Sequence, residues 1–119
     1  MAAKSEFLTF LQDQFERFGG VDARRMFGGI GLFRDGVMFG IVARDTLFLK
    51  TDDHSRTTYE SAGMGPFQYE RKGKTQSLGY HEVPVDVLED GDVLTEWAAI
   101  AHQIALTAKS GKARNKKPS

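Results

Sequence analysis

Residues 26–50 read MFGGIGLFRDGVMFGIVARDTLFLK, with three largely apolar runs separated by the polar pairs Asp35-Gly36 and Arg44-Asp45. Asp-Gly is a strong two-residue hairpin signal because both positions accept positive φ. The runs are rich in the β-branched and aromatic residues that fit a pleated, half-buried surface. We therefore predict strands over 25–34, 37–43 and 46–50. Turns this short cannot form parallel crossovers, so these strands must be antiparallel.

Downstream, the sequence predicts a second hairpin and two short helices. Residues 66–70 alternate apolar and polar side chains, residues 71–74 form a turn, and residues 75–83 alternate less cleanly. The polar segment 52–63 is predicted to be a short helix capped by Asp52 or Asp53. Pro84 precedes a single predicted helical turn that ends at Leu88, because proline is tolerated where a helix begins.

Each end of the chain predicts an amphipathic helix. Apolar residues from Phe7 to Phe18 recur at helical spacing, and Gly19-Gly20 ends that pattern. A second stripe includes Leu94, Trp97 and Ile104 and is predicted to stop at Ser110-Gly111. The expected fold is α+β: a curved, mainly antiparallel sheet of about five strands, packed on one face by the N-terminal and C-terminal helices. The order of the strands does not follow from the sequence.

The composition restricts the chemistry. The 119 residues are 40% hydrophobic and include no cysteine, which indicates one domain with an ordinary core and excludes disulfides, thiolate metal sites and a cysteine nucleophile. No apolar run approaches the ~18–20 residues of a membrane span. Residues 1–6 lack the layout of a signal peptide. We expect a soluble, cytoplasmic protein that has no membrane partner.

The zero net charge hides an asymmetry. Residues 109–119 contain five basic residues and no acid, which leaves 11 basic and 16 acidic residues in 1–108. The predicted organisation is a domain over 1–108 followed by a disordered basic tail over 109–119, because so polar a segment cannot offset the entropy of ordering. Such a tail could contact nucleic-acid phosphates or an acidic partner, or could simply aid solubility.

No catalytic or metal-binding pattern emerges. The glycines of 28–31 lead into a strand and a hairpin, whereas a phosphate cradle needs a strand-to-helix junction. His54, His81 and His102 lie in three different predicted elements without metal-ligand spacing. The serines occur in no Gly-x-Ser-x-Gly elbow. We therefore expect no catalytic residues, no metal and no cofactor.

The aromatic content, at 11%, is explained more simply by core packing than by base stacking. Basic residues nevertheless occur at predicted strand ends and turns, where a surface patch for nucleic acid or a partner could form if the strand order brought them together. The candidate contact residues of the body and the tail are Arg24, Arg25, Lys50, Lys72, Lys74, Lys109, Lys112, Arg114, Lys116 and Lys117.

The string 26–40, together with residues 47–50, 66–69 and 80–84 and with Trp97, resembles the N-terminal domain of the TfoX/Sxy family over about residues 10–107. Members of known role are regulators of natural competence that act with the cyclic-AMP receptor protein on transcription of DNA-uptake genes. They usually carry a second, C-terminal domain associated with DNA contact. This chain looks like a stand-alone N-terminal module. The family offers no catalytic residues to carry over.

Two functions follow as hypotheses. The first is a non-catalytic regulatory module that docks on a protein of the transcription machinery, with the basic tail adding attraction to DNA. The second is a small-molecule binding protein or enzyme with a pocket beside 52–63, where Asp52, Asp53, His54, Arg56 and Tyr59 gather near the sheet edge. Homodimerisation through a sheet edge or the Trp97 helix is a further expectation.

Overall fold

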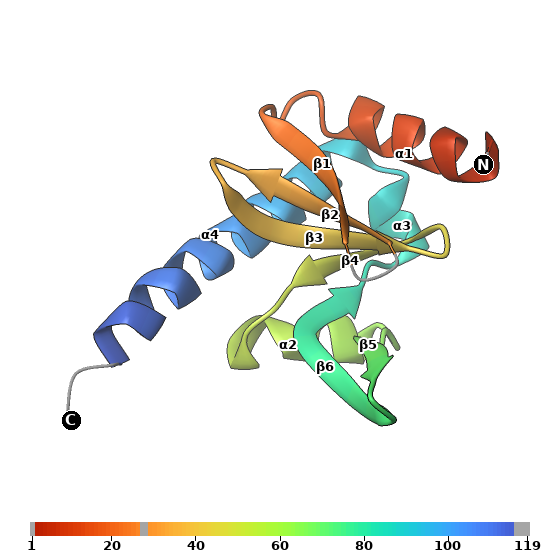
Figure 1. The fold of residues 1–119 in the computed structure, drawn as a ribbon. Helices are drawn as coiled ribbons and strands as arrows, with labels where there is room; N and C mark the ends of the chain where they lie inside the picture. The colour runs from red at the N-terminus through yellow and green to blue at the C-terminus, as the bar shows by residue number, and fades with distance from the viewer. Residues whose placement is uncertain (1, 27–28, 116–119) are drawn as a thin grey trace.

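The computed structural model describes residues 2–26 and 29–115, and Figure 1 shows its elements. The helices are α1 (Ala2–Gln14), α2 (Asp53–Ser61), α3 (Val85–Leu88) and α4 (Gly91–Asn115). The strands are β1 (Val21–Met26), β2 (Gly29–Arg34), β3 (Val37–Ala43), β4 (Thr46–Lys50), β5 (Pro66–Arg71) and β6 (Lys74–Glu82). They form one curved antiparallel sheet with the order β1-β2-β3-β4-β6-β5, which confirms the α+β class.

The strand count differs from the predicted five because the segment 25–34, expected to be one strand, is divided between two strands. β1 and β2 are separate strands that pair antiparallel, with Arg25 opposite Ile30. β1 escaped the sequence analysis because it is an edge strand whose side chains are half-buried or exposed, so VDARRM shows no apolar run. Close packing explains Gly29, where a Cβ atom would lie 2.4 Å from the carbonyl oxygen of Val42.

The two predicted turns of the first meander are confirmed. Asp35 and Gly36 have φ of 55° and 77°, and Arg44 and Asp45 have φ of 52° and 56°. Two successive positive φ values are the geometry of the hairpin turns whose twist matches that of the flanking strands. β2, β3 and β4 therefore follow one another as neighbours in the sheet.

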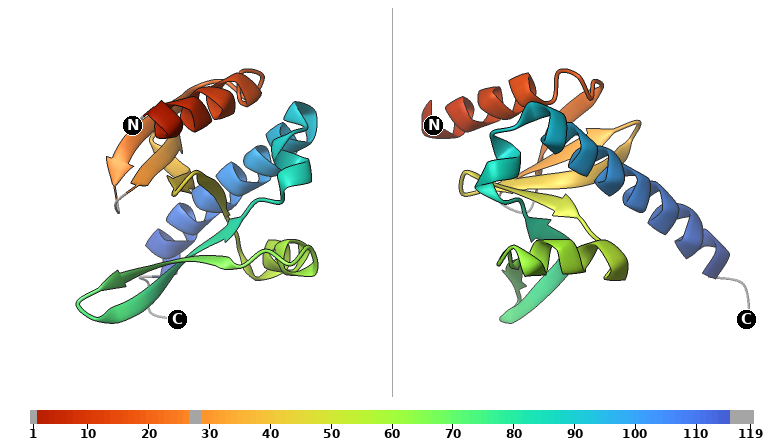
Figure 2. Two further views of the ribbon diagram at one scale, coloured as in Figure 1. Left: turned by 90° about the vertical axis from the view of Figure 1, so that its right-hand side faces the viewer. Right: turned by 180° about the vertical axis from the view of Figure 1, so that it is seen from behind.

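All four helices contribute to one main core on the same face of the sheet. Its buried members include Leu11 of α1, Tyr59 of α2, Val87 of α3 and Leu94 of α4, packed on strand residues such as Phe39. The expected packing of both terminal helices on one face is thus confirmed. Figure 2 shows α4 lying across the sheet.

A second, smaller core occupies the opposite face, inside the curve of the sheet. It consists of Ile41, Ala43, Phe48, Phe67 and Tyr80. β3 contributes to both cores because its side chains alternate between the two faces, and a β-bulge interrupts this alternation once. Leu32 pairs with Gly40 and Phe33 with Met38, so Phe39 has no directly opposed residue. The hydroxyl of Tyr80 donates a hydrogen bond to the carbonyl of Met38 at 3.2 Å.

Both terminal helices end elsewhere than predicted. α1 spans Ala2–Gln14, so it ends before the predicted stop at Gly19-Gly20. Gln14 Nε2 donates to the carbonyl of Leu88 at 2.7 Å. α4 continues to Asn115, past the predicted stop at Ser110-Gly111. A single glycine costs a helix only about 1 kcal/mol, which the surrounding alanine, lysine and arginine residues can offset. None of the helices described combines the length and the apolar character needed to cross a membrane.

Candidate functional site

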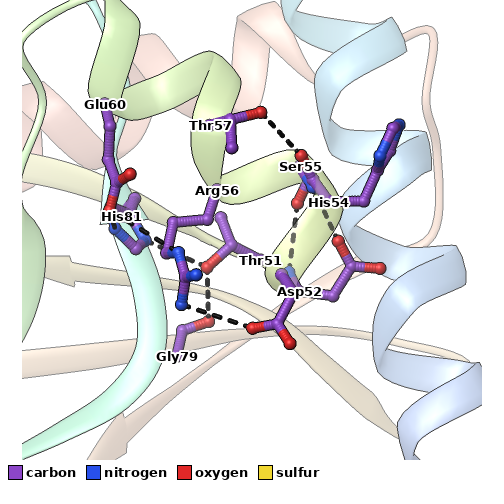
Figure 3. Close-up of polar contacts among 10 residues, drawn as sticks. Thr51, Asp52, His54, Ser55, Arg56, Thr57, Glu60, Gly79 and His81 are labelled. Carbon is purple, nitrogen blue, oxygen red and sulfur yellow. Dashed lines mark hydrogen bonds and ion pairs between the residues drawn. The ribbon is translucent and has the colours of Figure 1, made fainter.

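A shallow depression of about 300 Å³ lies between α2 and the strands β4, β5 and β6. The end of β4 leads into its floor, the first two turns of α2 form one wall, and β6 forms the other. Figure 3 shows its polar contacts. Its lining residues are Thr51, Asp52, Asp53, Arg56, Glu60, Pro66, Gly79 and His81.

A reciprocal cap holds the first turn of α2 in place. The backbone N–H of Ser55 donates to Asp52 Oδ1 at 2.8 Å, and the backbone N–H of Asp52 donates to Ser55 Oγ at 3.1 Å. This is a capping box, and it confirms Asp52 as the predicted cap. The hydrogen bond from the Ser55 backbone is also the main reason that the pKa of the Asp52 carboxyl is lowered.

Thr51 joins the end of β4 to β6. Its backbone N–H donates to the carbonyl of Gly79 at 2.8 Å, and its hydroxyl Oγ1 lies 3.1 Å from the same carbonyl oxygen. Gly79 has a φ of 77°, a conformation that favours glycine, so the backbone of β6 can turn this carbonyl toward Thr51.

His81 is the most buried titratable side chain of the depression, with 4% of the residue exposed. It lies opposite Leu49 in the β4–β6 pairing, and strand alternation sends its neighbour Tyr80 to the second core. Its Nδ1 lies 2.9 Å from Thr51 Oγ1, and its Nε2 lies 3.9 Å from Glu60 Oε2. Burial lowers the pKa of His81, the Glu60 charge raises it, and the Arg56 charge lowers it further.

Arg56 lies between two carboxylates on α2. Its Nη1 is 3.3 Å from Asp53 Oδ1, and its Nε is 3.6 Å from Glu60 Oε2. Pairs spaced three and four residues apart on an exposed helix face stabilise it by only about 0.2–0.5 kcal/mol each. The rim of the depression thus carries three carboxylates, Asp52, Asp53 and Glu60, against one guanidinium.

The structure brings together only some of the residues predicted for a pocket beside 52–63. Asp52, Asp53 and Arg56 line the depression, whereas His54 is exposed and does not. Tyr59 points into the main core, where burial raises the pKa of its hydroxyl. Sequence reasoning missed Thr51, Glu60 and His81, because only the pairing of β4 with β6 places His81 beside α2.

The basic residues of the body do not form one patch. Arg24 and Arg25 lie on β1, at one edge of the sheet, and Lys72 and Lys74 lie at the β5–β6 hairpin, which forms the other edge. Arg24 forms an ion pair on the same strand, with its Nε 3.3 Å from Asp22 Oδ2. On β4, the ammonium nitrogen of Lys50 lies 5.1 Å from the centroid of the Tyr80 ring. The strand order therefore separates the two sets of cations.

The basic tail differs in part from its prediction. The backbone of 109–115 is helical, so Lys109, Lys112 and Arg114 belong to the last turns of α4 instead of a disordered arm. Lys116 and Lys117 lie outside the described residues. A division of the chain into a domain and a separate tail at residue 108 stays a prediction.

The other two histidines lie outside the depression: His102 packs in the core, and His54 is exposed to solvent. Nε2 of His102 lies 2.9 Å from the carbonyl oxygen of Arg34, and its ring packs edge-on against Phe18 and Phe39. Among residues 2–26 and 29–115, no three His, Asp or Glu side chains converge as metal ligands would.

Comparison with known proteins places this fold in a family. The model of the TfoX N-terminal domain matches residues 13–105. The chain is also 28% identical, over 80 residues, to "DNA transformation protein TfoX1" of Aliivibrio fischeri, an alignment that covers 64% of this chain and 38% of that relative. This chain therefore spans well under half of the length of the relative that it matches. Because the family model covers most of the chain, the protein belongs to the TfoX N-terminal domain family.

Proposed function

We propose that this protein is a non-catalytic regulatory module of DNA transformation, which acts in the cytoplasm through a protein of the transcription machinery. The observation that carries the proposal is the family match over residues 13–105, together with a relative named for DNA transformation. The relative is longer than the matched region, so the role proposed here is that of the shared domain and is exerted through contacts of its surface.

The free edge of the sheet supports a protein partner. Within residues 2–26 and 29–115, β1 pairs only with β2, so the N–H and C=O groups on its outer side have no described strand beside them. An extended segment of a partner could add there as a further strand. Exposed apolar side chains, Phe10 of α1 at 38% and Val85 of α3 at 60%, offer additional contact area.

The proposal is tested in the organism that carries the protein. Deleting the coding sequence should lower the transformation frequency and the transcript levels of DNA-uptake genes, and the intact chain should restore both. Purified protein should retain RNA polymerase or the cyclic-AMP receptor protein at physiological salt. If transformation and transcripts are unchanged and neither protein is retained, the regulatory proposal is wrong.

DNA contact is the finer part of the proposal and has its own test. If the five cations of 109–117 bind duplex DNA, log K should fall with log salt with a slope of up to about 4 or 5 in magnitude. Replacing all five with glutamine should abolish this slope. A control in which Arg24, Arg25, Lys72 and Lys74 become glutamine should keep it. If both variants lose the slope equally, the tail has no special role in DNA binding.

Homodimerisation belongs to the same proposal. A second copy could pair through the free β1 edge or pack along α4. Sedimentation of the whole chain at several concentrations decides the question, because a monomer at every concentration would exclude self-association as part of the mechanism.

A further inference from the structure

The outer side of β1 is a regular strand edge with charged side chains beside it. In Figure 1, β1 lies at the opposite end of the sheet from the β5–β6 hairpin. Its register with β2 is unbroken from Val21 to Met26. Val21 and Ala23 pack against the main core, on the face of the sheet that the helices cover. Because side chains alternate along a strand, Asp22 and Arg24 project from the opposite face.

Asp22 and Arg24 give this edge one charge of each sign on the same face. Their side chains are 62% and 60% exposed, and Arg24 Nε lies 3.3 Å from Asp22 Oδ2. The Arg24 guanidinium also lies 4.8 Å from the centroid of the Phe33 ring on β2. An ion pair this exposed contributes little to stability. Both charges can therefore also interact with charges on a strand that is added to the edge.

Geometry restricts how a second copy of the chain can join this edge. Two outer edges can meet antiparallel only if both copies keep their helix-covered faces on the same side of the combined sheet. Directly opposed side chains of neighbouring strands project from the same face. Even-numbered residues of one β1 strand must therefore oppose even-numbered residues of the other. Two such registers pair all of β1 except one terminal residue. One places Ala23 opposite Ala23 of the second copy, and the other places Arg24 opposite Arg24.

Charge distinguishes the two registers. With Ala23 opposite Ala23, each Asp22 lies directly opposite Arg24 of the other copy. With Arg24 opposite Arg24, two guanidinium groups meet and Asp22 lies opposite the uncharged Met26. Opposite charges directly across a strand pair are stabilising, and like charges are destabilising. The order of charges along β1 therefore favours the register centred on Ala23.

We propose that the edge of β1 binds a second copy of this chain, antiparallel and with Ala23 opposite Ala23, so that the two sheets continue into one. The contact is isologous, because each copy contributes the same strand. On one face of the joined sheets, the Asp22 and Arg24 side chains of the two copies alternate in charge around the two-fold axis. On the helix-covered face, the small Ala23 side chains meet at the axis, and Arg25 lies opposite Val21.

This inference rests on the homodimerisation that belongs to the proposed function, and it narrows that association to one surface. Charged residues on edge strands commonly prevent association with other chains. Charges of a single sign would repel a second copy in every register, whereas Asp22 and Arg24 attract it in one. A single strand pair is smaller than a standard protein–protein interface, so we expect a weak dimer that requires high protein concentration.

Charge reversal tests the register in the whole chain. Asp22→Arg and Arg24→Asp each place like charges directly opposite each other, so each variant should dimerise at least roughly tenfold more weakly than the wild type in sedimentation. When the two variants are mixed, every arginine at position 22 or 24 lies opposite an aspartate of the other chain. The mixture should therefore dimerise although neither variant does so alone. Glu96→Arg makes the same charge change at an exposed position of α4 and should associate as the wild type does.

A single introduced thiol locates the two-fold axis. The chain contains no cysteine, so Ala23→Cys carries one reactive thiol, placed at the proposed axis. Directly opposed residues of antiparallel strands have Cα atoms about 4.5–5.5 Å apart, within the range that a disulfide spans. Ala23→Cys should form a covalent dimer under mild oxidation. Arg25→Cys, whose opposed residue in this register is Val21, should form much less.

Three results would overturn the proposal. The first is a wild-type chain that stays monomeric at millimolar concentration. The second is a dimer that neither Asp22→Arg nor Arg24→Asp weakens, or that Glu96→Arg alone disrupts, because it assigns the contact to another surface such as α4. The third is a disulfide that forms more readily at position 25 than at position 23. None of these measurements depends on transformation, so an unchanged transformation frequency contradicts the regulatory role and leaves the dimer standing.

Discussion

The indole ring of Trp97 meets the phenol ring of Tyr59 edge-on, with 4.8 Å between the ring centroids and an interplanar angle of 70°. Trp97 lies on α4 and Tyr59 on α2, so this pair fastens the long C-terminal helix to the helix that forms a wall of the depression. Both rings belong to the main core or pack against it.

A double-mutant cycle should show that the Tyr59 and Trp97 rings stabilise the fold through their direct contact. We expect Tyr59→Ala and Trp97→Ala to lower the free energy of unfolding by about 3–5 kcal/mol each, as large aromatic truncations in cores do. The double variant should lose about 0.5–1.5 kcal/mol less than the sum, because the edge-on contact is counted twice in the single variants. Urea denaturation followed by circular dichroism measures all four proteins. Strict additivity would mean that the two rings are energetically independent.

The loss of stability caused by a glycine-to-alanine substitution should depend on which atoms the new methyl group contacts. Gly29→Ala places a Cβ 2.4 Å from the backbone oxygen of Val42, which cannot move alone, whereas Gly31→Ala meets the flexible Met26 sulfur at 2.5 Å. We expect Gly29→Ala to be the more destabilising, within the roughly 1–3 kcal/mol of overpacking. Gly65→Ala, which meets no atom within 4 Å, is the control and should be neutral or slightly stabilising. Melting temperatures that reverse this order would contradict the close approach of β2 to β3.

The stability should decline with acid in two separate windows. The folded state keeps the pKa of His81 below its ordinary value of 6.5, so the unfolded chain binds the proton first and stability falls as pH drops below 6.5. The lowered pKa of Asp52 adds a loss only below its ordinary value of 3.8. In His81→Asn the first window should disappear, and in His54→Asn, which removes an exposed imidazole, it should remain. Denaturation midpoints measured between pH 7 and pH 3 distinguish these outcomes.

Thr51 should matter through its hydroxyl rather than through its shape. Thr51→Val keeps the volume but removes the hydroxyl that lies within hydrogen-bond distance of the Gly79 carbonyl and of His81 Nδ1, which should cost about 1–3 kcal/mol. Thr51→Ser keeps the hydroxyl and should lose less. The imidazole ¹⁵N spectrum of Thr51→Val should also differ from that of the wild type, because the hydroxyl is the hydrogen-bond partner of His81 Nδ1. An unchanged spectrum would mean that the hydroxyl does not influence the protonation of the His81 ring.

Local signals predicted the meander and the caps. Asp35-Gly36 specifies its hairpin through two residues that accept positive φ, and Asp52 caps α2 through a residue only three positions away. These features depend on neighbours in the chain, so they can be seen in the sequence. β1 could not be seen, because an edge strand exposes much of its surface and needs no apolar alternation.

The depression could be predicted only in part. Its α2 wall is local, and Asp52, Asp53 and Arg56 were identified from that segment. Its other wall depends on the pairing of β4 with β6, which joins residues about 30 positions apart. No short-range pattern encodes this pairing, so the contact of His81 with Thr51 becomes visible only in three dimensions.

The bulge at Phe39 changes how β3 tolerates insertions and deletions. On the C-terminal side of the bulge, Ile41 and Ala43 serve the second core, while on its N-terminal side Met38 does so, and the residues between them break the even–odd alternation once. Deleting Gly40 would remove the bulge and leave Met38, Phe39 and Ile41 alternating regularly between the two cores. Deleting a residue elsewhere in the strand would instead reverse the core that the residues beyond it face. Natural length variation in this meander should therefore fall in the turns at 35–36 and 44–45 or at the bulge itself, and not elsewhere in the strand.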